Sequence, residues 1–436
     1  MAPQIRSERD ILDSIEIDCD GLIEGDKEAI SIYRNWTFSA EEFERELHES
    51  PSRCRTFKEL FDFNTVPLSK EEEDYPLAYA MVVYKNVVQE VEAATRPGRP
   101  HENSIRILHA FAILKARQVL FQLSAFYHPQ NVYCLAVSGT AEQSFLNVLY
   151  DLQQCFPNIY VTSRPPLQWG NFEIINTTYA CVEHLYNSKT QWKYFQYLSN
   201  FDVPLKTNRE MVQIFKQLNG TVNADIEIFP RWRTQRMRRV RPPLPLVKSS
   251  LSILLSRSTI DTIVESPFTS QLLRYLTNTF IPDESFWITL AGNPHEFPVP
   301  GGFDAKELLK FQRQVIGAGT EVNKQYQTEA YPMNAYISRY QIWQRQKCRG
   351  IMYHWSCLFG INVLPTILKQ PHLVAHKFYM SYQPAAYFCI LKKLRERTYS
   401  PTPFDASHYA EIPFVEMSRG VSLQNLTHPE WLLRIY

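Results

Sequence analysis

Short apolar runs alternate with amphipathic segments along the middle of the chain. Three runs rich in β-branched or aromatic residues, Leu77–Val83, Asn131–Val137 and Asn158–Thr162, have the length and composition of strands. Polar and apolar residues follow a helical pattern from Ala141 to Gln154. This alternation predicts an α/β fold with a largely parallel central sheet flanked by helices. Because ligands bind beyond the carboxyl ends of such strands, we expect a site near the loops after the first two runs.

The segments around this pattern differ from it. Residues 1–73 are mixed and charged and predict a stem-like N-terminal region, with a helix beginning on a good N-cap at Ser39–Leu47. Residues 90–117 interrupt the passage from the first strand to its helix, and we interpret them as an inserted loop or an artefact of the gene sequence. Their apolar tail, Ile105–Leu114, can instead form an extra helix. We therefore predict a main domain at 74–395 and a C-terminal extension at 396–436.

Composition narrows the class of protein. The chain has 436 residues, 44% of them hydrophobic and 13% aromatic, which is typical of a folded globular protein with a substantial core. A formal charge of +1 gives no general attraction to nucleic acid or to an anionic membrane. No apolar stretch approaches the ~18 residues of a membrane span, and the first ten residues lack the apolar centre of a signal peptide. The sequence as it stands predicts neither an anchor nor an export signal.

Cysteines and glycosylation sequons point to the secretory pathway. The chain has eight cysteines, an even number, spread over its whole length. Four Asn-x-Ser/Thr sequons, the candidate N-glycosylation sites, begin at Asn35, Asn176, Asn219 and Asn425. Both features are typical of an oxidising compartment, although even cysteine counts also occur in the cytosol. A zinc site is the main alternative, but no Cys-x-x-Cys pair occurs.

One acidic pair stands directly behind a proline and among aromatic residues. Asp283 and Glu284 follow Pro282 within the segment Tyr275–Trp287. A structural interpretation is available, because proline suits the first position of a helix and carboxylates in the first turn complement the helix dipole. The chemical interpretation makes Glu284 a general base, and the rest of the chain favours it.

Five ordered segments, and with them most of the chain from Ile17 to Arg395, resemble a known family. The segments are Pro76–Val83, Tyr127–Cys134, Gln191–Asn208, Ile281–Glu284 and His372–Phe378. Together they resemble the core-2/I-branching β-1,6-N-acetylglucosaminyltransferases (glycosyltransferase family 14), and the chain looks like a divergent, invertebrate-like member. The resemblance implies a GT-A-like nucleotide-sugar domain that inverts the anomeric carbon of UDP-N-acetylglucosamine. In this family a glutamate in the position of Glu284 deprotonates the acceptor hydroxyl, and a lysine in the position of Lys377 binds the diphosphate.

The resemblance also selects one pairing of the eight cysteines. It implies four disulfides that leave no cysteine over: Cys19 with Cys389, Cys54 with Cys155, Cys134 with Cys181, and Cys348 with Cys357. By resemblance we expect a protein of the Golgi, where the family is normally held by a transmembrane helix that this chain does not show.

Further site residues are implied by position. On the donor side they are Val82, Tyr84, Ser138 and His354, and on the acceptor side Asp225, Arg233, Arg236 and Trp343. Three donor positions depart from the family pattern, since Tyr84 replaces a histidine, Ser138 an aspartate and His354 an arginine. The segment between Trp343 and Cys348 is also shorter than in vertebrate members.

The two arginines belong to a basic run from Arg231 to Arg241, which holds six arginines in eleven residues. Arginines beside a tryptophan can bind nucleic acid or an anionic glycan. With the whole chain near neutrality, we interpret the run as a solvated loop with two functional arginines and expect no nucleic-acid partner.

No metal or other cofactor is expected. The only Asp-x-Asp triplet, the metal-binding motif of most GT-A enzymes, is Asp18-Cys19-Asp20, whose cysteine is assigned to a disulfide. The resembled family works without metal and stabilises the departing UDP with basic side chains. The predicted partners are thus a nucleotide-sugar donor and an O-glycan or related acceptor. Two alternatives stay open: a non-catalytic relative that binds sugar or a partner, and a transferase that uses UDP-xylose.

Overall fold

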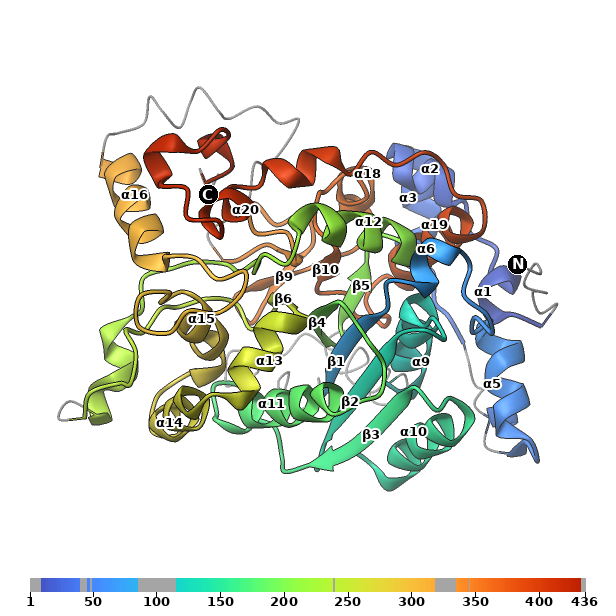
Figure 1. The fold of residues 1–436 in the computed structure, drawn as a ribbon. Coiled ribbons are helices and arrows are strands. Elements are labelled where there is room, and N and C mark those ends of the chain that lie inside the picture. Colours follow the sequence, from blue (N-terminus) through green and yellow to red (C-terminus); the bar gives the residue numbers. More distant parts are fainter. Residues whose placement is uncertain are drawn as a thin grey trace, which may run out of the picture.

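A five-stranded sheet lies at the centre of the protein (Figure 1). The computed structural model describes residues 9–39, 45–47, 49–84, 115–237, 240–317, 335–344 and 346–432. In spatial order the strands are β3 (Ile159–Arg164), β2 (Val132–Ser138), β1 (Leu77–Val83), β4 (Tyr194–Ser199) and β6 (Leu254–Ser256). The first four are parallel and β6 is antiparallel, which confirms the prediction of a largely parallel sheet.

The sequence of each strand matches its place in the sheet. Every residue of β1, β2 and β4 is buried, as expected for central strands covered on both faces. The edge strand β3 instead alternates between buried and exposed positions near its start. The apolar runs of the sequence therefore predict the strands because burial on two faces leaves almost no polar position.

The chain order reverses between β1 and β4. It runs from β1 through α9 (Lys115–Phe126) to β2, and through α10 (Gln143–Cys155) to β3. Helix α11 (Glu173–Tyr186) then packs on β1 and β2 and returns the chain to β4, on the other side of β1 (Figure 1). Such a reversal opens a crevice at the carboxyl ends of the two strands, where α/β proteins bind ligands.

Two smaller sheets flank this crevice. One has the order β5 (Asp202–Pro204), β10 (Val374–His376) and β7 (Arg339–Gln341), and the other is the hairpin β8 (Ile351–Tyr353) and β9 (Ser356–Leu358). After β5 the described chain also forms these helices and 3-10 turns: α12 (Asn208–Leu218), η1 (Arg231–Met237), α13 (Arg257–Glu265), α14 (Pro267–Leu276), η2 (Pro282–Glu284), α15 (Phe286–Ala291), α16 (Ala305–Gly317), η3 (Ile361–Val363), α18 (Leu364–Ile367) and α19 (Pro384–Tyr399).

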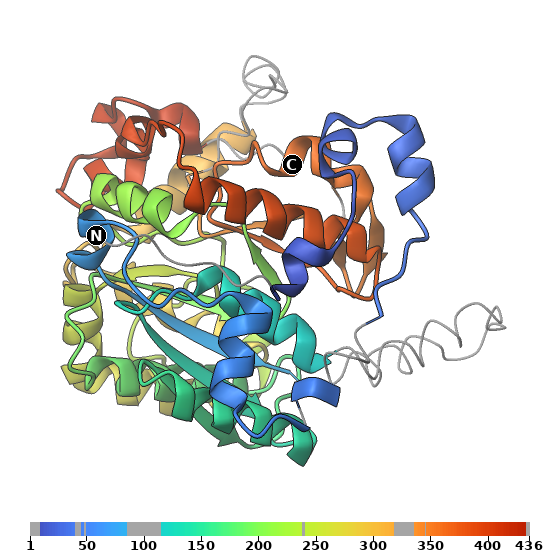
Figure 2. The same cartoon turned by 90° about the vertical axis from the view of Figure 1, so that its right-hand side faces the viewer.

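The two ends of the chain pack on this core. The N-terminal helices are α1 (Ile11–Ser14), α2 (Cys19–Glu24), α3 (Lys27–Tyr33), α5 (Arg53–Phe61) and α6 (Lys70–Glu73). Among them α1 contacts α19, and α2 contacts α18 (Figure 2). The C-terminal elements are η4 (Ser407–Glu411), α20 (Pro413–Met417), η5 (Leu423–Asn425) and η6 (Pro429–Leu432), and η4 packs on α12. The domain boundaries at 73 and 395 stay a prediction.

All four disulfides form as the family resemblance implied. Cys19 bonds Cys389, Cys54 bonds Cys155, Cys134 bonds Cys181, and Cys348 bonds Cys357. The first joins α2 to α19 across a separation of 370 residues. Cross-links of this kind persist in oxidising compartments and not in the cytosol.

Three predictions fall largely or wholly outside the described residues: the helix at Ser39–Leu47, the insertion at 90–117 and the helix at Ile105–Leu114. Of the helices that the structure describes, none is long and apolar enough to span a bilayer.

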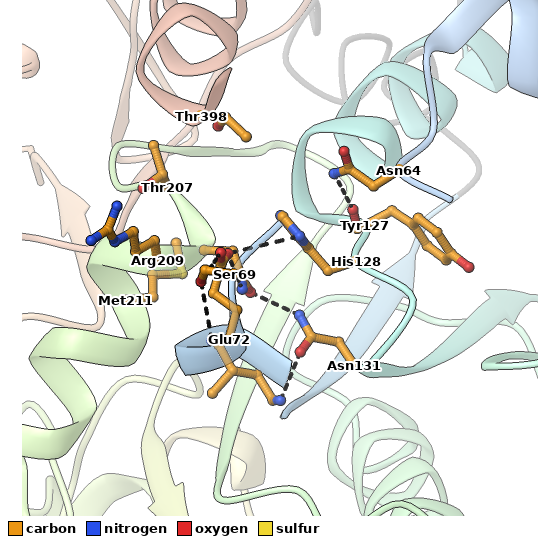
Figure 3. A network of polar contacts seen from close by, with 12 residues as sticks. Asn64, Ser69, Glu72, Tyr127, His128, Asn131, Thr207, Arg209, Met211 and Thr398 are labelled. Carbon is orange, nitrogen blue, oxygen red and sulfur yellow. Dashed lines mark hydrogen bonds and ion pairs between the residues drawn. The ribbon is translucent and has the colours of Figure 1, made fainter. Parts of the chain in front are cut away.

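A buried polar network closes the amino-terminal edge of the sheet (Figure 3). The carboxylate of Glu72 accepts hydrogen bonds from Asn208 Nδ2 (2.8 Å) and Ser69 Oγ (2.7 Å). Asn131 links this group to β1, because its Nδ2 donates to Asn208 Oδ1 and its Oδ1 accepts from the backbone N–H of Leu77. These bonds tie α6, α12 and the starts of β1 and β2 to one another.

Candidate active site

The site begins where β1 and β4 end. Asn200 joins the two strand ends, because its Oδ1 accepts a hydrogen bond from the backbone N–H of Tyr84 (3.2 Å). Burial raises the pKa of Tyr84 well above its usual value, and the neighbouring Tyr197 adds to the effect. Tyr84 is therefore a neutral hydrogen-bonding group at the predicted position.

A buried ion-pair network supports the floor of the site. Asp202, fully buried at the start of β5, accepts hydrogen bonds from Arg339 Nη2 and His376 Nδ1, each at 2.8 Å. Burial lowers the pKa of His376 to about 4, so this imidazole is neutral at physiological pH. Burial alone would raise the pKa of Asp202, but the charge of Arg339 and the contacts of His376 outweigh it and lower the pKa.

Lys377 follows His376 directly and is nearly buried. Its Nζ lies 5.0 Å from the ring centre of Tyr353 and 5.5 Å from that of Tyr379, and both distances suit cation–π contact. His354, next to Tyr353 in the β8–β9 turn, is exposed and has a φ of 46°, which is in the left-handed region. Tyr353 links the two residues, because its ring centre also lies 4.4 Å from that of His354. The assignment of Lys377 and His354 to a diphosphate site stays a prediction.

Glu284 lies in the single 3-10 turn η2, with Pro282 at its first position. Its Oε2 accepts a hydrogen bond from Arg233 Nη2 at 2.6 Å and lies 3.9 Å from Lys248 Nζ. The Glu284 side chain is 19% exposed, whereas that of Arg233 is 4% exposed. Two cations thus hold a carboxylate that solvent, or a substrate hydroxyl, can still reach.

Asp283 supplies a second carboxyl beside Glu284. Burial and the charge of Glu284 raise the pKa of Asp283 to about 7. Its charge also raises the pKa of Tyr84 and Tyr197, so Asp283 lies near both tyrosine side chains.

The acceptor-side residues are arranged differently from the prediction of a solvated loop. Arg233 is buried, and its backbone C=O accepts from the N–H of Phe280 (3.0 Å), so a backbone contact pins the basic run to the segment before Glu284. Asp225 is half-buried, and Trp343 is exposed beside the β8–β9 hairpin, where it bridges to Ser356. The side chain of Arg236 lies outside the described residues.

Two of the residues predicted to bind the nucleotide-sugar donor make their contacts within the protein. The Oγ of Ser138 accepts from the backbone N–H of Leu167 (3.1 Å) and lies 3.0 Å from Thr140 Oγ1. The side chain of Val82 is fully buried in β1, and its backbone C=O accepts from the N–H of Asn200 (3.3 Å). The structure places both residues at the crevice without presenting the Val82 side chain to it.

Sequence reasoning missed Lys248, Asp202 and Arg339. Lys248 is brought to Glu284 by an antiparallel bridge to Glu227, whose Oε1 it contacts at 2.7 Å. Asp202 stood in one of the five matching segments, which was the only available signal for it. Arg339 had no local signal.

Three of the four sequon asparagines are exposed: Asn35, Asn219 and Asn425. Asn176 is half-buried within α11 and its Nδ2 donates to Glu173. The four sites stay predictions.

Both aspartates of the Asp18-Cys19-Asp20 triplet make contacts with other parts of the protein. Asp18 Oδ1 caps α2 by accepting from the N–H of Gly21, and Asp20 pairs with Lys393 at 2.7 Å. Within the described residues, no three His, Cys, Asp or Glu side chains are grouped as metal ligands.

Fold and site together define a disulfide-bonded α/β protein with a partly exposed carboxylate, Glu284, held by cations, and a nearly buried lysine, Lys377, beside two tyrosine rings. A family model described as Core-2/I-Branching enzyme matches residues 110–367, more than half of the chain. The chain belongs to this family and is a glycosyltransferase.

Named relatives agree with this assignment. The chain is 27% identical over 406 residues to human β-1,3-galactosyl-O-glycosyl-glycoprotein β-1,6-N-acetylglucosaminyltransferase 3, covering 87% of this chain and 83% of the relative. It is 27% identical over 409 residues to the mouse protein of the same name, with the same coverage. A β-1,3-galactosyl-O-glycosyl-glycoprotein β-1,6-N-acetylglucosaminyltransferase of Bovine herpesvirus 4 is 26% identical over 404 residues, which are 87% of this chain and 83% of the relative.

Proposed function

We propose that the protein transfers N-acetylglucosamine from UDP-N-acetylglucosamine to a hydroxyl, C6 by analogy with its relatives, of an O-glycan acceptor. Transfer inverts the anomeric carbon, requires no metal and takes place in a GT-A-like domain. The observation that carries the proposal is the carboxylate of Glu284, partly exposed and held by Arg233 and Lys248. By resemblance to its relatives we expect the acceptor to be a protein-linked glycan that carries β-1,3-linked galactose.

One displacement accounts for the chemistry. The acceptor oxygen forms a bond to C1 of the donor sugar while the bond from C1 to the UDP oxygen breaks, and Glu284 takes the hydroxyl proton. General-base assistance of this kind contributes about 10²–10⁴-fold to the rate. The glutamic acid then returns the proton to solvent.

The departing UDP carries growing negative charge, and Lys377 is the residue that we assign to stabilise it. Its near-complete burial against two aromatic rings strengthens the interaction with a diphosphate, because little water screens the charge. His354 would assist from the β8–β9 turn. Since an imidazole lacks the planar fork of donors of the family's arginine, we expect this assistance to be weaker than an arginine would give.

The disulfides also indicate the cellular compartment. Four disulfides favour an oxidising lumen, and the named relatives act on glycoproteins, which are made in the secretory pathway. We therefore propose the Golgi lumen as the site of action.

A second candidate is a non-catalytic glycan-binding relative. The observation that favours it is Ser138, whose hydroxyl is engaged by Leu167 and Thr140 rather than directed to a nucleotide.

A donor screen tests the proposal. The secreted, disulfide-intact protein is incubated in excess chelator with UDP-N-acetylglucosamine or UDP-xylose and a panel of O-glycans, and released UDP is measured. Acceptor-dependent release from UDP-N-acetylglucosamine, with a β-linked product by NMR, supports the proposal. Preference for UDP-xylose changes the donor, dependence on a divalent cation contradicts the metal-independent mechanism, and no release with any donor favours the binding protein.

A further inference from the structure

Two aromatic side chains are exposed beside the base. Trp232 in η1 is 49% exposed and Phe280, four residues before Glu284, is 40% exposed. Their ring centres lie 6.0 Å apart and the planes are inclined by 44°. Most large aromatic side chains of this protein are buried in the core, so an adjacent exposed pair calls for a partner.

The pair is fixed to the catalytic carboxylate through Arg233. The Arg233 guanidinium carbon lies 5.6 Å from the Trp232 ring centre, while its Nη2 donates to Glu284. The N–H of Phe280 donates to the C=O of Arg233, and this bond fixes the backbone on which both aromatic rings stand. One buried guanidinium therefore separates the exposed rings from the base.

The chemistry of the surface suits a sugar ring. One face of a pyranose carries C–H groups, which pack on aromatic rings, while its hydroxyl edge needs polar partners. Arg231, next to Trp232 and exposed, supplies donors at the rim. A residue of the acceptor that is attacked at Glu284 would place its neighbouring sugar over the two rings.

We infer that Trp232 and Phe280 form a stacking platform for the acceptor sugar adjacent to the one that is glycosylated. The inference rests on the proposed function and adds two residues that determine its acceptor specificity. The platform gives the enzyme a preference for a disaccharide over the corresponding monosaccharide, without touching the donor.

Acceptor affinity measured by ligand-observed NMR tests the platform without requiring turnover. The acceptors are an O-glycan disaccharide with β-1,3-linked galactose and the monosaccharide that lacks the galactose. In Trp232→Ala, the dissociation constant for the disaccharide is expected to rise about tenfold, from the loss of one aromatic contact. The values for the monosaccharide and for UDP should stay unchanged.

Two further variants guard against misfolding. Trp232→Phe keeps a ring at the position and should retain most of the disaccharide preference. Tyr160→Ala removes an exposed aromatic side chain from the edge strand β3, away from the site, and should change neither affinity.

Equal weakening of both glycans in Trp232→Ala would overturn the inference, because it would indicate displacement of Arg233 rather than loss of stacking. Unchanged affinity for both would overturn it as well. If the wild-type protein binds the disaccharide through Trp232 but transfers no sugar, the platform stands and the proposed catalytic function fails. If it binds no glycan, both fail.

Discussion

Glu72 and Glu284 are two partly or fully buried carboxylates at opposite ends of one sheet. Glu72 is 3% exposed and is bonded to the neutral groups of Asn208 and Ser69. Glu284 is 19% exposed and is held by the cations Arg233 and Lys248. The carboxylate of Glu72 is enclosed by neutral donors, so a substrate cannot reach it. The carboxylate of Glu284 is held by cations and is partly exposed, so a substrate hydroxyl can approach it and transfer a proton to it. The comparison therefore separates a structural acid from the proposed base by its partners and its exposure.

A large effect should come from the lysine at the carboxyl end of the sheet. Lys377→Met removes the charge assigned to the departing UDP, and turnover should fall about 10²–10³-fold. The matched control is Lys393→Met, which removes a lysine of α19 that pairs with Asp20 and Glu396. Steady-state UDP release compares them, and equal rates in the two variants would refute the role of Lys377.

The pH dependence of protein stability tests the raised pKa of Asp283, which lies at the same end of the sheet as Lys377. Because the pKa of Asp283 is raised to about 7 in the folded state, folding favours the protonated acid. The stability contributed by this acid is complete below the unfolded pKa of about 4 and is lost as the pH rises towards 7, with a slope of at most about 1.4 kcal/mol per pH unit. Asp283→Asn should remove this slope in urea unfolding between pH 4 and 7. A variant that follows the wild-type profile would contradict the shifted pKa.

At the amino-terminal end of the sheet, we expect a substitution of Glu72 to lower the stability of the protein and to leave its catalytic rate unchanged. Glu72→Gln replaces one acceptor oxygen by an N–H donor, so either Asn208 or Ser69 loses its partner. A buried donor left unsatisfied costs about 1–3 kcal/mol. The midpoint of urea unfolding should shift accordingly, while turnover per folded molecule stays the same. An unchanged midpoint would show that the network contributes little.

The smallest effect is expected at Lys248, which stands farther from Glu284 than Arg233 does. Lys248→Met should change the transition-state free energy by at most about 1 kcal/mol, as for other solvent-accessible ion pairs. High salt should shrink the difference between variant and wild type, because it screens the pair. Measuring kcat/KM at low and high ionic strength checks both points, and a large, salt-independent loss would mean that Lys248 acts directly on the substrate.

The sequence predicted the sheet well because burial leaves a local signature. The apolar run Leu77–Val83 coincides with β1, and the other two runs agree with β2 and β3 to within one or two residues. Glu284 was also identifiable, since proline and two acids in succession form a local motif. The disulfides required the family resemblance, because eight cysteines alone leave many pairings open.

Other parts of the site could not be found locally. Asp202 and Arg339 are far apart in the sequence, and only the pairing of β5, β10 and β7 brings them together. Arg233 was predicted to be one of two functional arginines in a solvated loop, but the Phe280 contact and Glu284 draw it inward and bury it. Tertiary contacts, rather than residue type, decide that Arg233 is buried beside Glu284.

The central claim is that Glu284, and not another buried acid, is the base. Single-turnover transfer from bound UDP-N-acetylglucosamine to saturating acceptor, measured for Glu284→Gln beside Glu72→Gln, tests it most directly. We predict that Glu284→Gln binds the donor normally but transfers the sugar about 10²–10⁴-fold more slowly, while folded Glu72→Gln matches the wild type. Transfer by Glu284→Gln at the wild-type rate would contradict the account.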